Sequence, residues 1–320
     1  MTSTNKLSIF DGRYREASEW LIKWFTEDEY IRIRYQVECA WLDTLCEQLP
    51  QCLLTDGNIP KVPIDYEEKL NNVRKECDVT RIRELERETK HDVKAIELYL
   101  KERLAKITDE IPLEWVHMCL TSQDVNSLAQ TIILNNALFT LNNKLYEYLT
   151  SFNEKINNSN GDWKCIMLAH THGQPAIPTT LNHELGFHIN RIKSTLYNLS
   201  KMELTFKFGG AIGNWAAGVF AFPEISLEEW HRRFFLNVCN ARKYPISSGV
   251  YFPGLRRLIR SDHTTQTDDY SCYYRIFNEL CLLMRQIRSF ADYIRNLIHD
   301  NYLIQHPVFI FIKFCNWICH

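Results

Sequence analysis

Apolar residues recur at three- and four-residue spacing along most of the chain, and this spacing predicts helices. In "TEDEYIRIRYQVECAWLDTLCEQL", Thr26 and Glu29 form a capping-box pattern that predicts the start of a helix. An apolar stripe follows on one face of this helix: Tyr30, Ile33, Val37, Trp41 and Leu45. Shorter helices are predicted in "DYEEKLNNVRKEC", in "VTRIRELERE" and in "DVKAIELYLKERLAKI", which opens at Asp92. The alternating pattern of β-strands is nearly absent.

Two runs are longer than the usual helix. From Ser122, a predicted N-cap, the sequence reaches about Asn157 without proline or glycine, which is about 50 Å of helix. A second run extends from Thr179 to about Phe208 and carries His188 among its apolar positions. A capped helix near Ser226 and an amphipathic run over about 270–305 complete the pattern. Such lengths predict an all-α fold, a long-helix bundle of a kind that is often oligomeric.

Composition narrows the class of protein. The 320 residues are 45% apolar and 24% charged, as in ordinary soluble proteins, and the net charge of −2 gives no basic excess for nucleic acid. The cysteine count is odd and no C-x-x-C occurs, so we expect reduced thiols in the cytoplasm, no metal site and no disulfide framework. The apolar tail at 306–320 is too interrupted for a membrane span, and the N-terminus has no signal-peptide pattern.

Several polar clusters fall at predicted helix boundaries, where free N–H groups favour anions. They are "DGRY" at 11–14, "KHD" at 90–92, "TSQD" at 121–124, "THGQ" at 171–174 and "TTQ" at 264–266. Each has an ordinary structural explanation when taken singly, as a cap, a turn or a surface charge. Together they predict one site built from several helix ends.

The residue types in these clusters suit acid–base chemistry on an anionic substrate. Donors come from the side chains of Arg13, Lys90, Thr121, Ser122 and Gln266. A histidine such as His172 titrates near neutrality and can transfer protons. "GGAIGNWAAG" lacks the patterns of phosphate-binding loops, and we interpret it as a flexible backbone turn. We therefore expect no cofactor.

Together with "ERETKHDVKAIELYLKERL" and "GGAIGNW", these motifs resemble the adenylosuccinate lyases of the fumarase/aspartase superfamily. The resemblance covers about residues 8–239 and 264–305. It implies β-elimination of fumarate from adenylosuccinate, giving AMP, and from the succinyl-aminoimidazole-carboxamide ribotide in purine nucleotide biosynthesis. It also implies a cytoplasmic homotetramer with sites shared between subunits, no cofactor, and no nucleic-acid or membrane partner.

The resemblance assigns roles to individual residues. His172 would be the general acid, with His91 close to it and His170 as a neighbour. Thr121 and Ser122 would bind the succinyl portion, Thr171 would also contact substrate, and Gln266 would orient it. The nucleotide portion would be held by Arg13, Tyr14, Lys90, His91 and Asp92.

The sequence also departs from this family. The loop that carries the family's serine base, S-S-x-M-P-x-K-x-N-P, is not present, and 244–263 reads as an insertion. "TDDYSCYYRIF" stands where a His-Asp pair is usual, and the tail matches nothing in the family. We expect an N-terminal domain at 1–112, an incomplete central bundle at 113–305 and an atypical tail at 306–320.

These departures predict a truncated or mis-spliced chain with little or no activity alone, since general-base catalysis contributes about 10²–10⁴ in rate. An alternative is a non-catalytic helical-bundle fragment that associates with full-length lyase subunits. A lyase for another succinyl amine is a third interpretation, against which the "KHD" and "TSQD" motifs argue.

Overall fold

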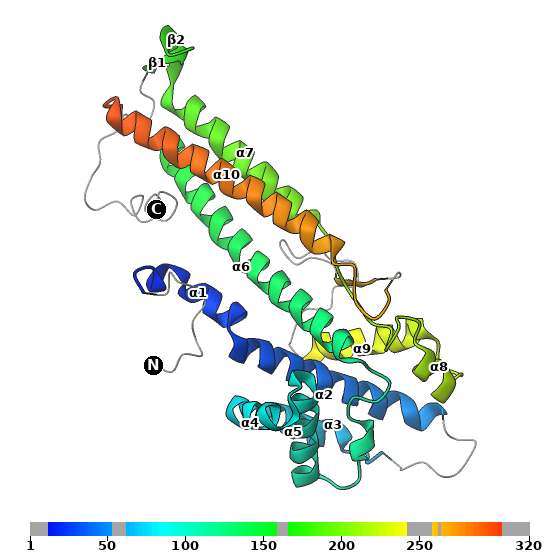
Figure 1. The fold of residues 1–320 in the computed structure, drawn as a ribbon. Coiled ribbons are helices and arrows are strands. Elements are labelled where there is room, and N and C mark those ends of the chain that lie inside the picture. The colour runs from blue at the N-terminus through cyan, green and yellow to red at the C-terminus, as the bar shows by residue number, and fades with distance from the viewer. Residues whose placement is uncertain (1–11, 53–61, 159–165, 242–257, 262–263, 303–320) are drawn as a thin grey trace. The chain divides into compact units, whose positions relative to one another are not determined.

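The fold is described by a computed structural model for residues 12–52, 62–158, 166–241, 258–261 and 264–302. The predicted helical class is confirmed, and helices account for most of the described residues (Figure 1). In the first half of the chain the helices are α1 (Arg15–Phe25), α2 (Glu27–Cys52), α3 (Tyr66–Lys75), α4 (Val79–Thr89), α5 (Asp92–Ile107) and α6 (Ser122–Asn158). In the second half they are α7 (Leu181–Lys201), α8 (Ala216–Ala221), α9 (Leu227–Ala241) and α10 (Ser271–His299).

The chain forms two compact units that do not follow chain order. The first unit comprises the described residues of Met1–Ala137, Leu204–Phe252 and Leu258–Tyr270. The second comprises those of Leu138–Glu203, Pro253–Arg257 and Ser271–His320, so α6 contributes residues to both units. The predicted domain division at residue 112 stays a prediction.

The first unit is organised around α2. The backbone N–H of Glu29 donates to Oγ1 of Thr26 at 3.4 Å, as the capping pattern predicts. The apolar stripe of α2 packs against α9, α5 and α3. At its centre the fully buried Trp41 has four aromatic rings within 5.4–5.7 Å: Phe208, Trp215, Trp230 and Phe234. The indole N–H donates to the carbonyl of Met118 at 2.8 Å, so the one polar atom of this side chain is satisfied.

The second unit is built from the later part of α6 together with α7 and α10. In α7 the predicted apolar positions Leu185 and Ile192 are buried, as is Ile189, and the helix packs on α10. Phe152 of α6 meets Phe290 of α10 edge to face at 5.8 Å. Other large apolar side chains of this unit are exposed: Tyr146, Phe187, Tyr197, Tyr274, Phe277, Leu282 and Met284.

Strands β1 (Ile166–Thr171) and β2 (Gln174–Thr180) form an antiparallel hairpin in the second unit, where the sequence predicted almost no strand (Figure 1). The pair Thr171 and Gln174 closes the ladder, which leaves His172 and Gly173 as a two-residue loop. Both loop residues have positive φ, 52° and 74°, as a type I′ turn requires. The short strands escape an apolar-period search because most of their side chains are exposed on both faces.

The second long predicted helix ends earlier than expected. α7 stops at Lys201, and the chain then forms β3 (Leu204–Phe206), which pairs in parallel with β4 (Leu258–Arg260) in the first unit. Strand β4 lies within the predicted insertion at 244–263, most of which falls outside the described residues. The tail at 306–320 also lies outside them. None of the described helices combines the length and the apolarity that crossing a membrane would require.

Candidate active site

The predicted residues Arg13 and Tyr14 lie in the turn that leads into α1. Tyr14 occupies the N-cap position, and its carbonyl accepts a hydrogen bond from the hydroxyl of Ser18 at 3.2 Å. The Arg13 side chain is exposed, and its guanidinium carbon lies 5.5 Å from the Tyr14 ring centroid. Asp11 of the same motif lies outside the described residues.

The "KHD" motif forms the junction between α4 and α5. Lys90 ends α4 in the left-handed region with φ of 56°, and its N–H donates to the carbonyl of Glu86 at 2.8 Å. His91 is the N-cap of α5, because its Nδ1 accepts the backbone N–H of Lys94 at 3.2 Å. In a neutral ring this places the proton on Nε2, on an exposed side chain that can donate it to a ligand. The predicted helix start at Asp92 is confirmed, while the capping side chain is His91.

Asp92 is held by a buried arginine that sequence reasoning did not single out. Its Oδ2 accepts a hydrogen bond from Arg34, and its Oδ1 accepts the N–H of Val93 at 2.8 Å. Partial burial raises the pKa of Asp92, but the hydrogen bond and the charge of Arg34 outweigh it, and the net pKa is lowered. The carboxylate is therefore charged and fixed in direction near neutral pH.

Thr121 and Ser122 lie at the start of α6, at the end of the helix whose dipole favours anions. The helix begins at Ser122, so the cap position belongs to Thr121, one residue before the predicted one. The carboxylate of Asp124 reaches back and accepts the N–H of Thr121 at 2.9 Å. Both predicted side chains are half-buried and remain partly accessible at the helix end.

Asp124 also connects this helix end to the glycine-rich segment. Its oxygens accept the N–H groups of Gly209 and Gly210 at 3.0 and 3.1 Å. The fully buried ammonium of Lys207 donates to Asp124 at 2.7 Å and to the carbonyl of Gly210 at 2.6 Å. Burial raises the pKa of Asp124, and the charge of Lys207 opposes that rise. The motif "TSQD" thus contributes a structural residue beside its predicted binding residues.

The "TTQ" segment lies directly against the same glycine-rich turn. Gly213 has φ of 84°, and a Cβ built there would lie 2.2 Å from the carbonyl oxygen of Thr264. Only glycine allows this close approach, so the glycine-rich turn packs tightly against Thr264. Gln266, two residues after Thr264, has an exposed side chain.

The predicted residues therefore fall into two groups. Thr171, His172 and the neighbouring His170 are exposed on the β1–β2 hairpin of the second unit. The others belong to the first unit: Arg13, Tyr14, Lys90, His91, Asp92, Thr121, Ser122 and Gln266. The closeness of His91 to His172 stays a prediction.

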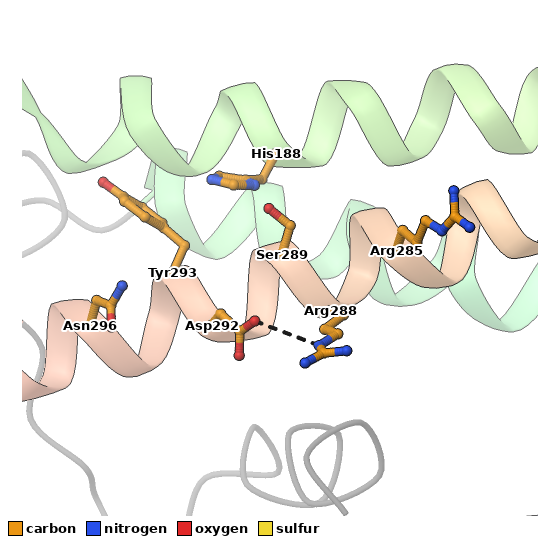
Figure 2. A pocket seen from close by; sticks show the side chains of 7 residues that line it. All are labelled: His188, Arg285, Arg288, Ser289, Asp292, Tyr293 and Asn296. Atoms are coloured by element: carbon orange, nitrogen blue, oxygen red, sulfur yellow. Dashed lines mark ion pairs between the residues drawn. The ribbon is translucent and has the colours of Figure 1, made fainter. Parts of the chain in front are cut away.

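The second unit also contains a pocket of about 460 Å³ beside α7 and α10, and none of the predicted site residues lines it (Figure 2). His188 stacks on Tyr293 with ring centroids 4.9 Å apart, and burial together with the charge of Arg191 lowers the pKa of His188. Tyr293 donates to Glu184 at 3.2 Å, and Glu184 also accepts from Thr179 of β2 at 3.1 Å. This chain of bonds anchors the base of the hairpin to α10. The lining residues are His188, Arg285, Arg288, Ser289, Asp292, Tyr293 and Asn296.

Sequence reasoning missed the polar residues that hold these motifs in place. Lys207 interrupts the apolar "TFKFGG", and a charge between two buried phenylalanines is a signal that could have been noticed. Arg34 gives no such signal, because it lies in the mixed segment "YIRIRYQV". Over the described residues, no group of three or more His, Cys, Asp or Glu side chains could hold a metal ion.

Comparison with known proteins settles the family. A family profile described as lyase matches residues 12–224, which is most of the part that carries the motifs. The chain belongs to this lyase family. Within the fumarase/aspartase superfamily, its relatives named adenylosuccinate lyase include those of Escherichia coli strain K12 and Haemophilus influenzae. The lyase chain is 32% and 33% identical to them over 240 and 248 residues, covering 72% of itself and 50% of each.

The lyase chain thus spans about half the length of the curated relatives that it matches. Solved structures support the fold. A fumarate lyase from Mesorhizobium sp. BNC1 superposes with a TM-score of 0.62 at 14% identity, covering 88% of this chain and 57% of that one. A 3-carboxy-cis,cis-muconate lactonizing enzyme from Pseudomonas putida gives a TM-score of 0.63 at 16% identity, covering 91% and 58%.

Proposed function

We propose that this lyase chain contributes to a site that cleaves adenylosuccinate to AMP and fumarate, and the corresponding succinyl-aminoimidazole-carboxamide ribotide. The observation that carries the proposal is that the start of α6 and the "TTQ" segment both contact the same glycine-rich turn within one compact unit. Relatives named adenylosuccinate lyase, about 30% identical over 72% of the chain, support the substrate.

The reaction is an elimination in which two groups move protons. A base takes a proton from the succinyl carbon, the electron pair of that C–H bond forms the C=C bond of fumarate, and the C–N bond breaks. The acid then gives a proton to the departing nitrogen. We assign the acid to His172, whose exposed imidazole can reach a ligand from the turn of the hairpin.

Negative charge develops on the succinyl carboxylate during this step, and fixed donors that meet it lower the barrier. We assign that role to Thr121 and Ser122 at the N-terminus of α6, where the helix dipole favours anions. Arg13, Tyr14 and the Lys90–Asp92 motif would hold the nucleotide, and Gln266 would orient the substrate. Thr171, next to His172, would contact it from the hairpin.

The family's serine loop would supply the general base, and this loop is not among the 320 residues. We propose that the site is shared between the subunits of an assembly, in which a subunit that carries the loop would complete it. The exposed apolar side chains on the long helices favour such an assembly, because isolated soluble units rarely expose so many. The same observation favours the second candidate function, a non-catalytic fragment that binds lyase subunits.

The test measures fumarate release from adenylosuccinate by the 320-residue chain alone and mixed with a full-length subunit that lacks its own histidine acid. We expect little or no release alone and restored release in the mixture. His172→Asn is the matched control, because asparagine tolerates the positive φ of the turn and cannot act as the acid.

Restoration by the original chain but not by His172→Asn would support the catalytic role. Association without restoration would favour the non-catalytic fragment. No association and no release would contradict both candidates. A panel of other succinyl amines, run beside adenylosuccinate, tests whether the substrate class is right.

A further inference from the structure

Arg34 of α2 contacts two segments that carry predicted site residues, although it is 4% exposed itself. Its Nη1 donates to Oδ2 of Asp92, the first residue of α5, and to Oδ1 of Asn126 in α6 at 3.3 Å. These partners lie 58 and 92 residues away along the chain. One guanidinium group therefore joins the start of α5 to the beginning of α6.

Asn126 lies on the same face of α6 as Ser122, because residues four apart stack along a helix. Its Oδ1 also accepts a hydrogen bond from the hydroxyl of Tyr30 at 3.2 Å. That hydroxyl accepts a hydrogen bond from Nε2 of Gln130, also at 3.2 Å. Gln130 comes one further turn along the same face. Ser122 is thus the outer end of a polar row whose inner positions bond to α2.

The Arg34 guanidinium is fixed from a further direction by the ring of Tyr30, whose centroid lies 4.2 Å from the guanidinium carbon. Arginine suits this position because its planar group stacks on a ring and offers several donors in fixed directions. A lysine ammonium is a single point charge on a flexible stem and cannot replace all of these contacts.

We propose that Arg34 is a positioning residue of the adenylosuccinate site, which sets the Lys90–Asp92 motif relative to the Thr121–Ser122 helix end. This inference rests on the proposed function. Arg34 is buried and contacts protein groups on α2, α5 and α6, so it acts through Asp92 and Asn126. Holding a site through such supporting contacts limits the misplacement that weakens binding and catalysis.

The electrostatics of Asp92 agree with this role. Burial raises its pKa, but the hydrogen bond and the charge of Arg34 together lower it by more, so the net pKa is lowered. The N–H of Val93 and the charge of His91 make smaller contributions in the same direction. Nδ1 of His91 lies 3.7 Å from Oδ1 of Asp92. Without Arg34 the burial would remain and its main compensation would be lost, so the pKa of Asp92 would rise.

The experiment compares Arg34→Met and Arg34→Lys with Arg32→Met. Arg32 is a matched control on the same helix, exposed and bonded to the carbonyl of Cys77 at 3.0 Å. Carbon-13 NMR follows the Asp92 carboxyl through a pH titration, with Asp92→Asn identifying the signal. Amide exchange is measured over the first turns of α5 and α6, and calorimetry gives the affinity of the chain for adenylosuccinate.

In Arg34→Met we expect a raised pKa of Asp92 and faster exchange at both helix starts. We also expect affinity reduced by about tenfold or more, as for a lost hydrogen bond to a charged group. In Arg34→Lys we expect a lower pKa of Asp92 than in Arg34→Met, because the positive charge remains. Amide exchange at the start of α6 should still be faster than in the original chain. Arg32→Met should behave as the original chain in all three measurements.

An unchanged pKa, or unchanged exchange at either helix start, overturns the proposal. So does an unchanged affinity in Arg34→Met when the original chain binds. If the original chain does not bind adenylosuccinate, the proposed substrate fails, and the titration and exchange still decide whether Arg34 sets the two helix starts. A change in both supports that positioning, and the absence of either change refutes it.

Discussion

Trp41 in the first unit and Phe277 in the second are both large aromatic residues on long helices, yet they are 0% and 49% exposed. Trp41 is enclosed by aromatic rings of its own unit, and its polar atom is bonded. Phe277 belongs to a set of exposed apolar side chains on α6, α7 and α10. The first unit also exposes some large apolar side chains, such as Phe220, but in the second unit they recur along the long helices, as on surfaces that other proteins cover.

The same contrast holds for the polar residues of the candidate site. In the first unit Asp92 and Asp124 are each fixed by a buried cation, Arg34 and Lys207. In the second unit His172 is an exposed turn residue of a hairpin whose base is held by a bond between Thr179 and Glu184. In the shared site that we propose, His172 would have to remain accessible to another subunit.

The largest expected effect tests the comparison directly. Trp41→Ala removes the centre of an aromatic cluster, and we expect the free energy of unfolding to fall by about 4 kcal/mol. Phe277→Ala removes a half-exposed ring and should cost less than about 1 kcal/mol. Urea unfolding followed by circular dichroism measures both. Equal losses of stability in the two variants would show that Trp41 and Phe277 contribute alike despite their different exposure.

The buried ion pair of the first unit gives the next largest effect. Lys207→Met leaves Asp124 without its cation in a fully buried position, and we expect a loss of about 3 kcal/mol. The loss should shrink as the pH is lowered, because a protonated Asp124 no longer needs a cation. Urea midpoints at pH 7 and pH 5 provide the measurement. Lys106→Met, on the exposed side of α5, is the control and should change the stability little. A loss of stability in Lys207→Met that does not depend on pH would contradict the assigned ion pair.

The two regions also differ in how far the sequence predicts them. Helices such as α5, which begins at Asp92 as predicted, follow from local apolar spacing and short-range capping. The bonds of Arg34 and Lys207 join residues 58 and 83 positions apart, and no local pattern specifies such partners. The predicted helix boundaries therefore drew attention to the motif residues of the first unit, but they could not identify the buried cations that hold these residues.

The hairpin was missed for a different reason. Its strands bury almost nothing, so apolar alternation has no core face to report. The informative signal was the His172–Gly173 pair, since consecutive residues with positive φ suit a two-residue hairpin loop. The turn that presents His172 was therefore not predicted, and the roles of the candidate site residues stay predictions.

A pH-dependent effect of intermediate size tests the buried charges of the first unit. Burial lowers the pKa of His117, but the charge and hydrogen bond of Glu38, with Nδ1 and Oε1 2.6 Å apart, raise it more, and the net pKa is raised. A raised pKa in the folded state contributes stability below about pH 6.5 that is lost as the pH rises through the folded value.

His117→Gln should therefore cost about 1.5 kcal/mol at pH 6, as for a hydrogen bond between charged groups, and progressively less toward alkaline pH. Thermal unfolding of both forms across this range measures the difference. A gap between them that widens with rising pH would contradict the assigned ion pair.

The smallest effects concern two glycines of the second unit, with opposite signs expected. At Gly173 a Cβ meets no atom within 4 Å, but φ is 74°, so Gly173→Ala should destabilise the hairpin by about 1 kcal/mol through backbone strain alone. Gly186 lies inside α7 with equally open space and no positive φ, so Gly186→Ala should stabilise that helix by about 0.5–1 kcal/mol. Amide exchange in β1, β2 and α7 separates the two, with roughly fivefold changes expected for 1 kcal/mol. Neither methyl group would touch another residue, so only the backbone conformation distinguishes the two sites. If both substitutions change the stability in the same direction, the hairpin turn does not impose the left-handed conformation that presents His172.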